Sequence, residues 1–70
     1  MRITDAKDFG QAIRKRRKSL NLTQSYLAEA SGFSISFISD LENGKETAEL
    51  GRALHLASLL GLDFEFKARV

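Results

Sequence analysis

The chain has 70 residues, 43% of them hydrophobic and 29% charged, which predicts one small globular domain spanning residues 1–70. No apolar run approaches the roughly 20 residues of a bilayer span, and the first 20 residues are charged throughout, so we expect neither a transmembrane helix nor a signal peptide. Cysteine is absent and His55 is the only histidine, which argues against disulfides, a metal site or a cofactor.

The charge is unevenly distributed along the chain. The net charge is only +2, but five basic residues are consecutive from Arg14 to Lys18. An electrostatic field that is positive on one part of the chain favours an anionic partner. One helix spreads five consecutive residues around its whole circumference, so the alternative is a solvated surface with one arginine turned inward.

The first predicted helix runs from about Asp5 to Leu20. Asp5 can cap its first turn, and the helical period places four apolar residues on one face: Ala6, Phe9, Ile13 and Leu20. Arg16 and Arg17 lie near that face, so one arginine must turn inward and find a partner. The residues that point away are Lys7, Gln11, Arg14, Lys15 and Lys18.

Residues 23–43 are predicted to form two short helices about a tight turn. Thr23 and Ser34 are suited to cap the two helices, and Gly32 permits the turn between them. The second helix of such a unit enters the DNA major groove. Its outward face, the expected base-facing surface, consists of Ile35, Ser36, Ser39 and Asp40.

A fourth helix is expected to end at Gly61, after which the pattern changes to the strict alternation of a β-strand over residues 62–70. A strand needs a hydrogen-bonding partner, and within the chain only the short stretch Arg2-Ile3-Thr4 could provide one. The same strand of a second copy is the simplest partner. The tail is therefore a candidate dimerisation strand, although the fourth helix, or both elements, could form the interface instead. The residues assigned to the dimer strand are Phe64, Phe66 and Ala68.

The chain resembles the Xre/Cro-repressor helix-turn-helix family over roughly residues 5 to 61. The matching pieces are IRKRRKSLNLTQ, Leu27-Ala28, GFS from Gly32 to Ser34, and the segment from Ile38 to Lys45. The strand pattern of LDFEF is most similar to HipB-type antitoxin regulators. The resemblance implies a mostly α, four-to-five-helix lambda-repressor-like domain with one short C-terminal strand that pairs across a homodimer.

The resemblance also implies roles for particular residues. Arg17 and Glu42 match the family's structural ion pair, which provides a partner for the inward-facing arginine. Contact with the DNA backbone is implied for Gln24, Asn43 and Lys45, and we add Ser34 and Phe37 to that group. Phe37 and Ile35 could also contact thymine methyl groups, or could simply be loosely packed apolar residues.

Two positions depart from the family pattern. Arg16 replaces a usually aliphatic residue, so we expect its stem to pack while its guanidinium reaches solvent or phosphate. The helix from Ser34 also lacks Arg, Lys, Gln and Asn on its outward face, so the bidentate contacts that read guanine or adenine are not available. Specificity must then come from methyl contacts, serine hydroxyls, Asp40 on a cytosine amine, or DNA shape.

The sequence thus predicts a cytoplasmic, nucleoid-associated repressor that binds double-stranded DNA as a homodimer on an inverted repeat. The resemblance favours a HipB-like antitoxin that represses its own operon and holds a HipA-like kinase toxin. The alternative is a stand-alone or phage-type repressor without a toxin partner. Catalysis has little support, because the chain has one histidine, no cysteine, no glycine-rich phosphate loop after a strand and no carboxylate pair that the pattern places in a cleft, so we do not expect an enzyme.

Overall fold

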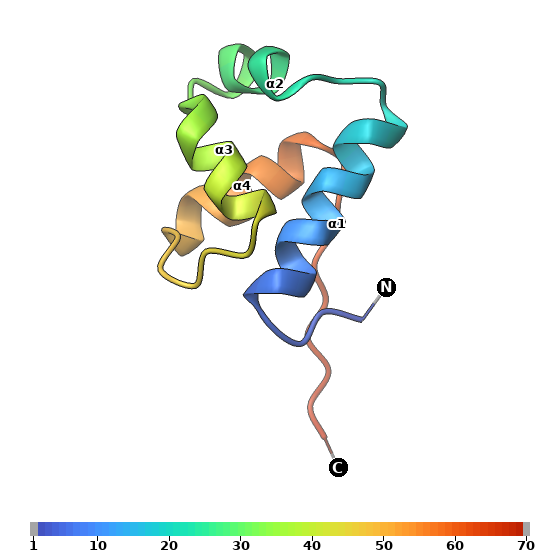
Figure 1. Cartoon of the computed structure of the whole chain (residues 1–70). Helices are drawn as coiled ribbons and strands as arrows, with labels where there is room; N and C mark the ends of the chain where they lie inside the picture. The colour runs from blue at the N-terminus through green and yellow to red at the C-terminus, as the bar shows by residue number, and fades with distance from the viewer. Residues whose placement is uncertain (1, 70) are drawn as a thin grey trace.

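The computed structural model describes residues 2–69, in which four α-helices surround a small core (Figure 1). The chain order is α1 (Ala6–Ser19), α2 (Gln24–Ser31), α3 (Ile35–Glu42) and α4 (Leu50–Leu59). Helix α3 packs against both α1 and α2. Within the described residues, no helix has the length and apolar character needed to cross a membrane.

Side chains at the helix N-termini explain where the helices begin. Asp5 accepts a hydrogen bond from the amide of Asp8, Thr23 from Tyr26 and Ser34 from Phe37, as a capping residue does. These three caps match the sequence prediction. A fourth cap, which the sequence analysis did not identify, is Glu49, whose carboxylate accepts from the first amides of α4.

The turn between α2 and α3 depends on a left-handed residue. Gly32 ends α2 with φ 77°, a conformation that side chains with a Cβ rarely adopt. The same geometry after α1 is taken by Asn21 at φ 59°, and asparagine tolerates it better than most residues. Both residues therefore terminate helices where the sequence indicated.

The core consists of nine buried hydrophobic residues contributed by all four helices. Leu20 is not among them, contrary to expectation, because it lies beyond the last turn of α1 and is 40% exposed. Among the largest, Ile13, Ile38 and Leu56 are almost completely shielded from solvent. The full set is Ile13, Leu27, Ala28, Ile38, Leu41, Ala53, Leu56, Ala57 and Leu60.

Gly10 sets the distance between α1 and the C-terminal end of α3. A Cβ at this position would collide with the carbonyl oxygen of Leu41 and lie 2.9 Å from that of Glu42. Both contacts are with backbone, which cannot swing aside like a side chain. The absence of a side chain at residue 10 therefore lets the two helices approach closely, a requirement that the sequence analysis did not identify.

The prediction for Arg16 was wrong. Its Nε donates a 2.8 Å hydrogen bond to the carbonyl oxygen of Leu60, the residue that follows α4. The last carbonyls of a helix have no partner within the helix, and a cation there is favoured by the helix dipole. Arg16 therefore joins α1 to the end of α4, and its side chain is partly buried there.

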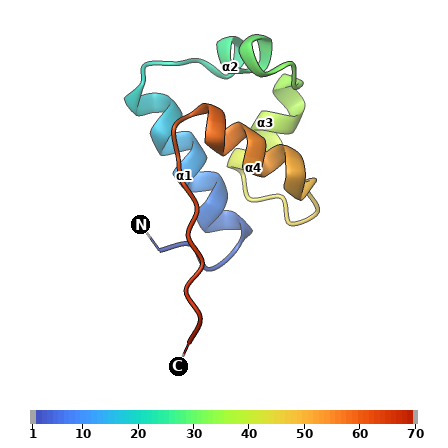
Figure 2. The same cartoon turned by 180° about the vertical axis from the view of Figure 1, so that it is seen from behind.

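The predicted strand is absent from residues 62–69, which run past the N-terminal end of α1 as an extended tail in both views (Figures 1 and 2). Leu62 is half-buried and the Phe64 ring stacks on Phe9, with centroids 5.5 Å apart. Farther along, Phe66 is 98% exposed. A single chain offers this tail no neighbouring strand for its backbone hydrogen bonds. Val70, the last residue of the predicted strand, lies outside the described residues.

Candidate nucleic-acid interface

A buried ion pair fixes the end of α3 to α1. The Arg17 Nε lies 2.7 Å from Glu42 Oε2, and Nη2 lies 3.0 Å from Oε1, so the contact is bidentate. The third donor of Arg17, Nη1, reaches the carbonyl oxygen of Leu22 at 2.7 Å. The hydrogen bond to Glu42 raises the pKa of Arg17 above its ordinary value, against the effect of burial. The inward-facing arginine is therefore Arg17, and its partner is Glu42.

Gln24 extends this pair to the N-terminus of α2. Its Nε2 donates to Glu42 Oε1 at 3.2 Å, so one carboxylate is shared between a guanidinium and an amide. Gln24 was predicted to contact phosphate, and its hydrogen bond to Glu42 was not predicted. A primary amide has two donors and one acceptor oxygen, so Gln24 keeps further hydrogen-bonding capacity while Glu42 restricts its orientation.

The outward face of α3 is small and close to neutral. Ile35 is 48% exposed, and Ser36 and Asp40 are also exposed, whereas Ser39 is half-buried. Asp40 forms a loose ion pair with Lys45, whose Nζ lies 3.5 Å from its carboxylate. The negative charge of Asp40 is thus partly compensated by Lys45 in the loop after α3.

Ser34 caps α3, as the sequence predicted, whereas Phe37 is only partly exposed. The Ser34 hydroxyl accepts a 3.0 Å hydrogen bond from the Phe37 amide, which leaves its own hydrogen free to donate. The Phe37 ring is partly buried and packs edge-on against Phe33 at 5.3 Å. Phe33 in turn meets His55 of α4 at 5.9 Å. His55 is an exposed surface residue in an aromatic cluster, and no metal-binding group of side chains occurs within residues 2–69.

The loop after α3 carries Asn43 and Lys45, both exposed. Asn43 is the C-cap of α3, and the amide of Lys45 donates back to the carbonyl of Asp40 at 3.0 Å. Gly44 makes this fold-back possible with φ 84°. These contacts hold the loop against the end of α3, and the Lys45 side chain reaches Asp40 on its outward face.

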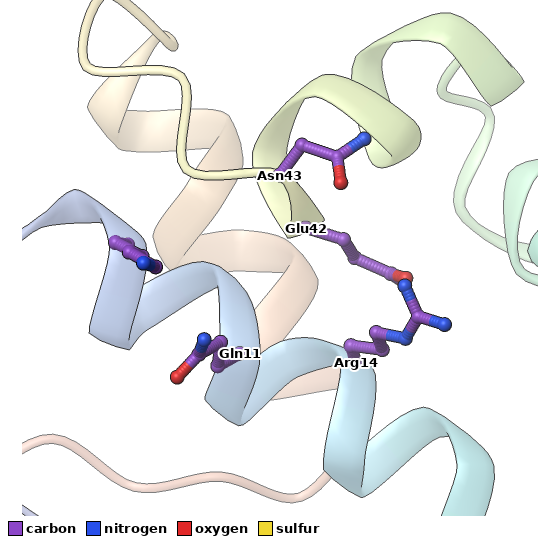
Figure 3. Close-up of a pocket in the computed structure, with 5 residues that line it drawn as sticks. Gln11, Arg14, Glu42 and Asn43 are labelled. Atoms are coloured by element: carbon purple, nitrogen blue, oxygen red, sulfur yellow. The ribbon is translucent and has the colours of Figure 1, made fainter.

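A polar hollow lies between α1 and the end of α3 and was not predicted. Its volume is about 330 Å³, and Figure 3 shows its lining side chains, which come from both helices. The α1 residues are Lys7, Gln11 and Arg14, whose i, i+4, i+7 spacing places them on one helical face. The helical period had placed all three on the outward side of the first helix, but it could not show that the end of α3 lies beside them.

The residues assigned to the dimer strand lie on the C-terminal tail and do not line the polar hollow. Phe64 is 42% exposed despite its contact with Phe9, while Phe66 and Ala68 are open to solvent. They border a large groove of about 1350 Å³ formed by the N-terminal residues, α4 and the tail. The exposed apolar side chains along that groove include Ile3, Leu50 and Leu54.

Comparison with known families decides the relationship, because the helix-turn-helix family matches residues 13–67. The chain belongs to the helix-turn-helix family, of the Xre type. Members of this family are DNA-binding transcriptional regulators. The match includes α2 and α3, the ion-paired Arg17 and Glu42, and most of the tail.

Two curated relatives support this membership. The uncharacterized HTH-type transcriptional regulator y4mF of Sinorhizobium fredii is 40% identical over 67 residues, covering 96% of this chain and 88% of the relative. The ImmF control region 10 kDa protein of Bacillus phage phi105 is 36% identical over 61 residues, covering 87% and 68%.

The fold matches solved structures closely. A chain of a HipB-O4 20mer complex superposes with a TM-score of 0.87 at 24% identity, covering 97% of this chain and 96% of that one. A chain described as MDT Protein gives 0.86, also at 24% identity, with the same coverage. At these identities the likeness concerns the fold alone.

Proposed function

We propose that this helix-turn-helix protein is a sequence-specific transcriptional repressor that binds double-stranded DNA with α3 in the major groove. The observation that carries the proposal is the Arg17–Glu42–Gln24 network, which fixes the exposed face of α3 relative to α1 and α2. A rigid support is what a short recognition helix needs, because its side chains must meet base edges at defined positions.

Backbone contacts provide most of the affinity in this proposal. Gln24 and Ser34 lie at the N-termini of α2 and α3, where free amides favour phosphate. Asn43 and Lys45 follow the C-terminal end of α3 and can donate hydrogen bonds to phosphate through their side chains. Phe37 has a smaller part, as an apolar contact at the edge of the interface, because its ring is already packed against Phe33.

Base discrimination falls to Ile35, Ser36, Ser39 and Asp40. Ile35 can contact a thymine methyl group, the serines can donate or accept one hydrogen bond, and Asp40 can accept from a cytosine amine. Asp40 must leave Lys45 to do so. A face with no bidentate donor gives modest discrimination, so DNA shape contributes to the choice of site.

The decisive experiment is salt-titrated binding to a selected operator and to a random-sequence duplex. Lys45→Ala removes one cation from the phosphate backbone, so we expect weaker binding to both duplexes and a salt slope reduced by about 0.9 for each phosphate that is no longer neutralised. Gln24→Ala weakens both without a comparable change in slope, because the amide is neutral. Ser36→Ala and Ser39→Ala change the preferred sequence instead. Affinities that are insensitive to Lys45→Ala would contradict the proposed mode of binding.

A homodimer on an inverted repeat is the second element of the proposal. Two recognition helices then enter successive major grooves about 34 Å apart. Support comes from the apolar groove and from Phe66, which is 98% exposed in the single chain. Exposed aromatic residues beside a groove mark association surfaces, and a second tail can satisfy the extended backbone of residues 62–69.

The biological setting has two candidates. The fold likeness to HipB supports an antitoxin that represses its own operon and binds a HipA-like kinase toxin. The phage relative supports a stand-alone repressor with no toxin partner. Affinity capture of the tagged protein from its native host separates them: a stoichiometric kinase-like partner supports the antitoxin, and recovery of DNA without such a partner supports the stand-alone repressor.

A further inference from the structure

We propose that the hollow between α1 and the end of α3 binds a phosphate group of the DNA backbone, so that α1 forms part of the DNA-contacting surface. The inference rests on the proposed DNA-binding function and extends it to Lys7, Gln11 and Arg14. None of these residues belongs to the helix-turn-helix unit itself.

The geometry of the hollow suits a tetrahedral anion. Lys7, Gln11 and Arg14 share one face of α1 and line the hollow. Figure 3 shows Gln11 and Arg14 on α1 and Asn43 across from them at the end of α3. A volume of about 330 Å³ accommodates a phosphodiester group together with water. An ammonium, a guanidinium and two amides can all donate hydrogen bonds to phosphate oxygens.

The charge of the hollow is positive in effect. Glu42 is its one acidic wall residue, and both carboxylate oxygens are occupied, by Arg17 at 2.7 and 3.0 Å and by Gln24 at 3.2 Å. In the part of the chain that the structure describes, Lys7 and Arg14 form no salt bridge. Their charges are therefore available to an external anion.

The position of the hollow continues the proposed interface. Asn43 is both a wall of the hollow and a proposed backbone contact, so a DNA strand that meets Asn43 also lies at the edge of the hollow. A purely structural explanation also exists, since cations near the carbonyl end of α3 are favoured by its dipole. In that case Lys7 and Arg14 would contribute to stability and not to the salt dependence of DNA binding.

The test compares Lys7→Gln, Arg14→Gln and their double variant with the full-length wild type, on a random-sequence 20-base-pair duplex from 50 to 300 mM salt. We expect the slope of log K against log[salt] to fall by about 0.9 for each phosphate contact removed, in every protomer bound. Lys15→Gln and Arg52→Gln, which remove exposed charges elsewhere, are the matched controls. The charge-retaining pair Lys7→Arg and Arg14→Lys should restore most of the slope.

The outcomes separate the two proposals. Wild-type protein that shows no salt-dependent binding to any duplex overturns the proposed function itself. A wild-type slope in the double variant, or a drop matched by Lys15→Gln, overturns the phosphate site alone. If the double variant unfolds at lower urea concentration but keeps the wild-type salt slope, then Lys7 and Arg14 stabilise the α3 dipole and do not contact DNA. Should the double variant fold poorly, Lys7→Gln alone carries the comparison.

Discussion

The ion pair between Arg17 and Glu42 is the most consequential contact of single residues in this protein. Both side chains are nearly inaccessible, at 9% and 1% exposure. Glu42→Gln leaves a buried guanidinium without its counter-ion, and we expect a loss of about 3–5 kcal/mol in the free energy of unfolding. Urea denaturation measures this loss. The double variant Arg17→Met/Glu42→Leu should recover much of this stability. If it does not, Arg17 contributes mainly through its hydrogen bond to the carbonyl oxygen of Leu22.

Asp8 gives the N-terminus of α1 a predictable response to acid. Its carboxylate accepts from the Thr4 hydroxyl at 2.7 Å and the Thr4 amide at 3.1 Å, and these bonds hold the pKa of Asp8 below its ordinary 3.8. A lowered folded-state pKa means that the stabilisation is complete above pH 3.8 and is lost as the pH falls through the lowered value.

Asp8→Asn should therefore flatten the pH dependence of unfolding below about pH 4 without changing its slope near neutrality. Urea denaturation between pH 2.5 and about 6 measures the effect, and Thr4→Val should reproduce part of it. Asp63→Asn in the exposed tail is the control. Identical acid profiles for wild type and Asp8→Asn would show that the contact with Thr4 does not persist in solution.

Between elements, Arg16 joins α1 to α4, and Gly10 lets α1 approach α3. Arg16→Met keeps an apolar stem but leaves the Leu60 carbonyl without its donor, so we expect a loss of about 1–3 kcal/mol. Chemical denaturation provides the measurement. Lys15→Met, at a neighbouring exposed position, should change stability by less than about 0.5 kcal/mol. Equal losses in both variants would show that helix propensity, not the link to α4, is responsible.

At the scale of the whole molecule, the tail governs our expectation for assembly. Deleting residues 63–70 removes Phe64 and Phe66 from the edge of the apolar groove, so we expect a monomer or a weaker dimer with a large loss of operator affinity. Sedimentation equilibrium measures the mass. Leu54→Glu tests the α4 side of the same groove, and Leu59→Glu, exposed but outside it, is the control. Unchanged mass after deletion combined with dissociation by Leu54→Glu would place the interface on α4.

Local signals were sufficient for much of the fold. The caps at Asp5, Thr23 and Ser34 and the left-handed residues Asn21 and Gly32 are determined by neighbouring residues, so the sequence locates them within a turn. The strand pattern of residues 62–70 is also a local signal, but a strand requires a partner backbone, which no pattern can provide. The alternation therefore describes a capacity for pairing and not a structure of the single chain.

Long-range contacts were the part that sequence reasoning could not reach. The helical period shows that one of two adjacent arginines faces inward, and the family resemblance correctly pairs Arg17 with Glu42. Neither signal predicts that Arg16 reaches the end of α4, 44 residues away. Likewise, helical spacing aligns Lys7, Gln11 and Arg14, but the hollow exists because Gly10 brings α1 against the end of α3. Periodicity and capping act over a few residues, so the sequence by itself determined the helices and the family. Partners and cavities depend on the relative placement of helices, and that was decided by the tertiary structure.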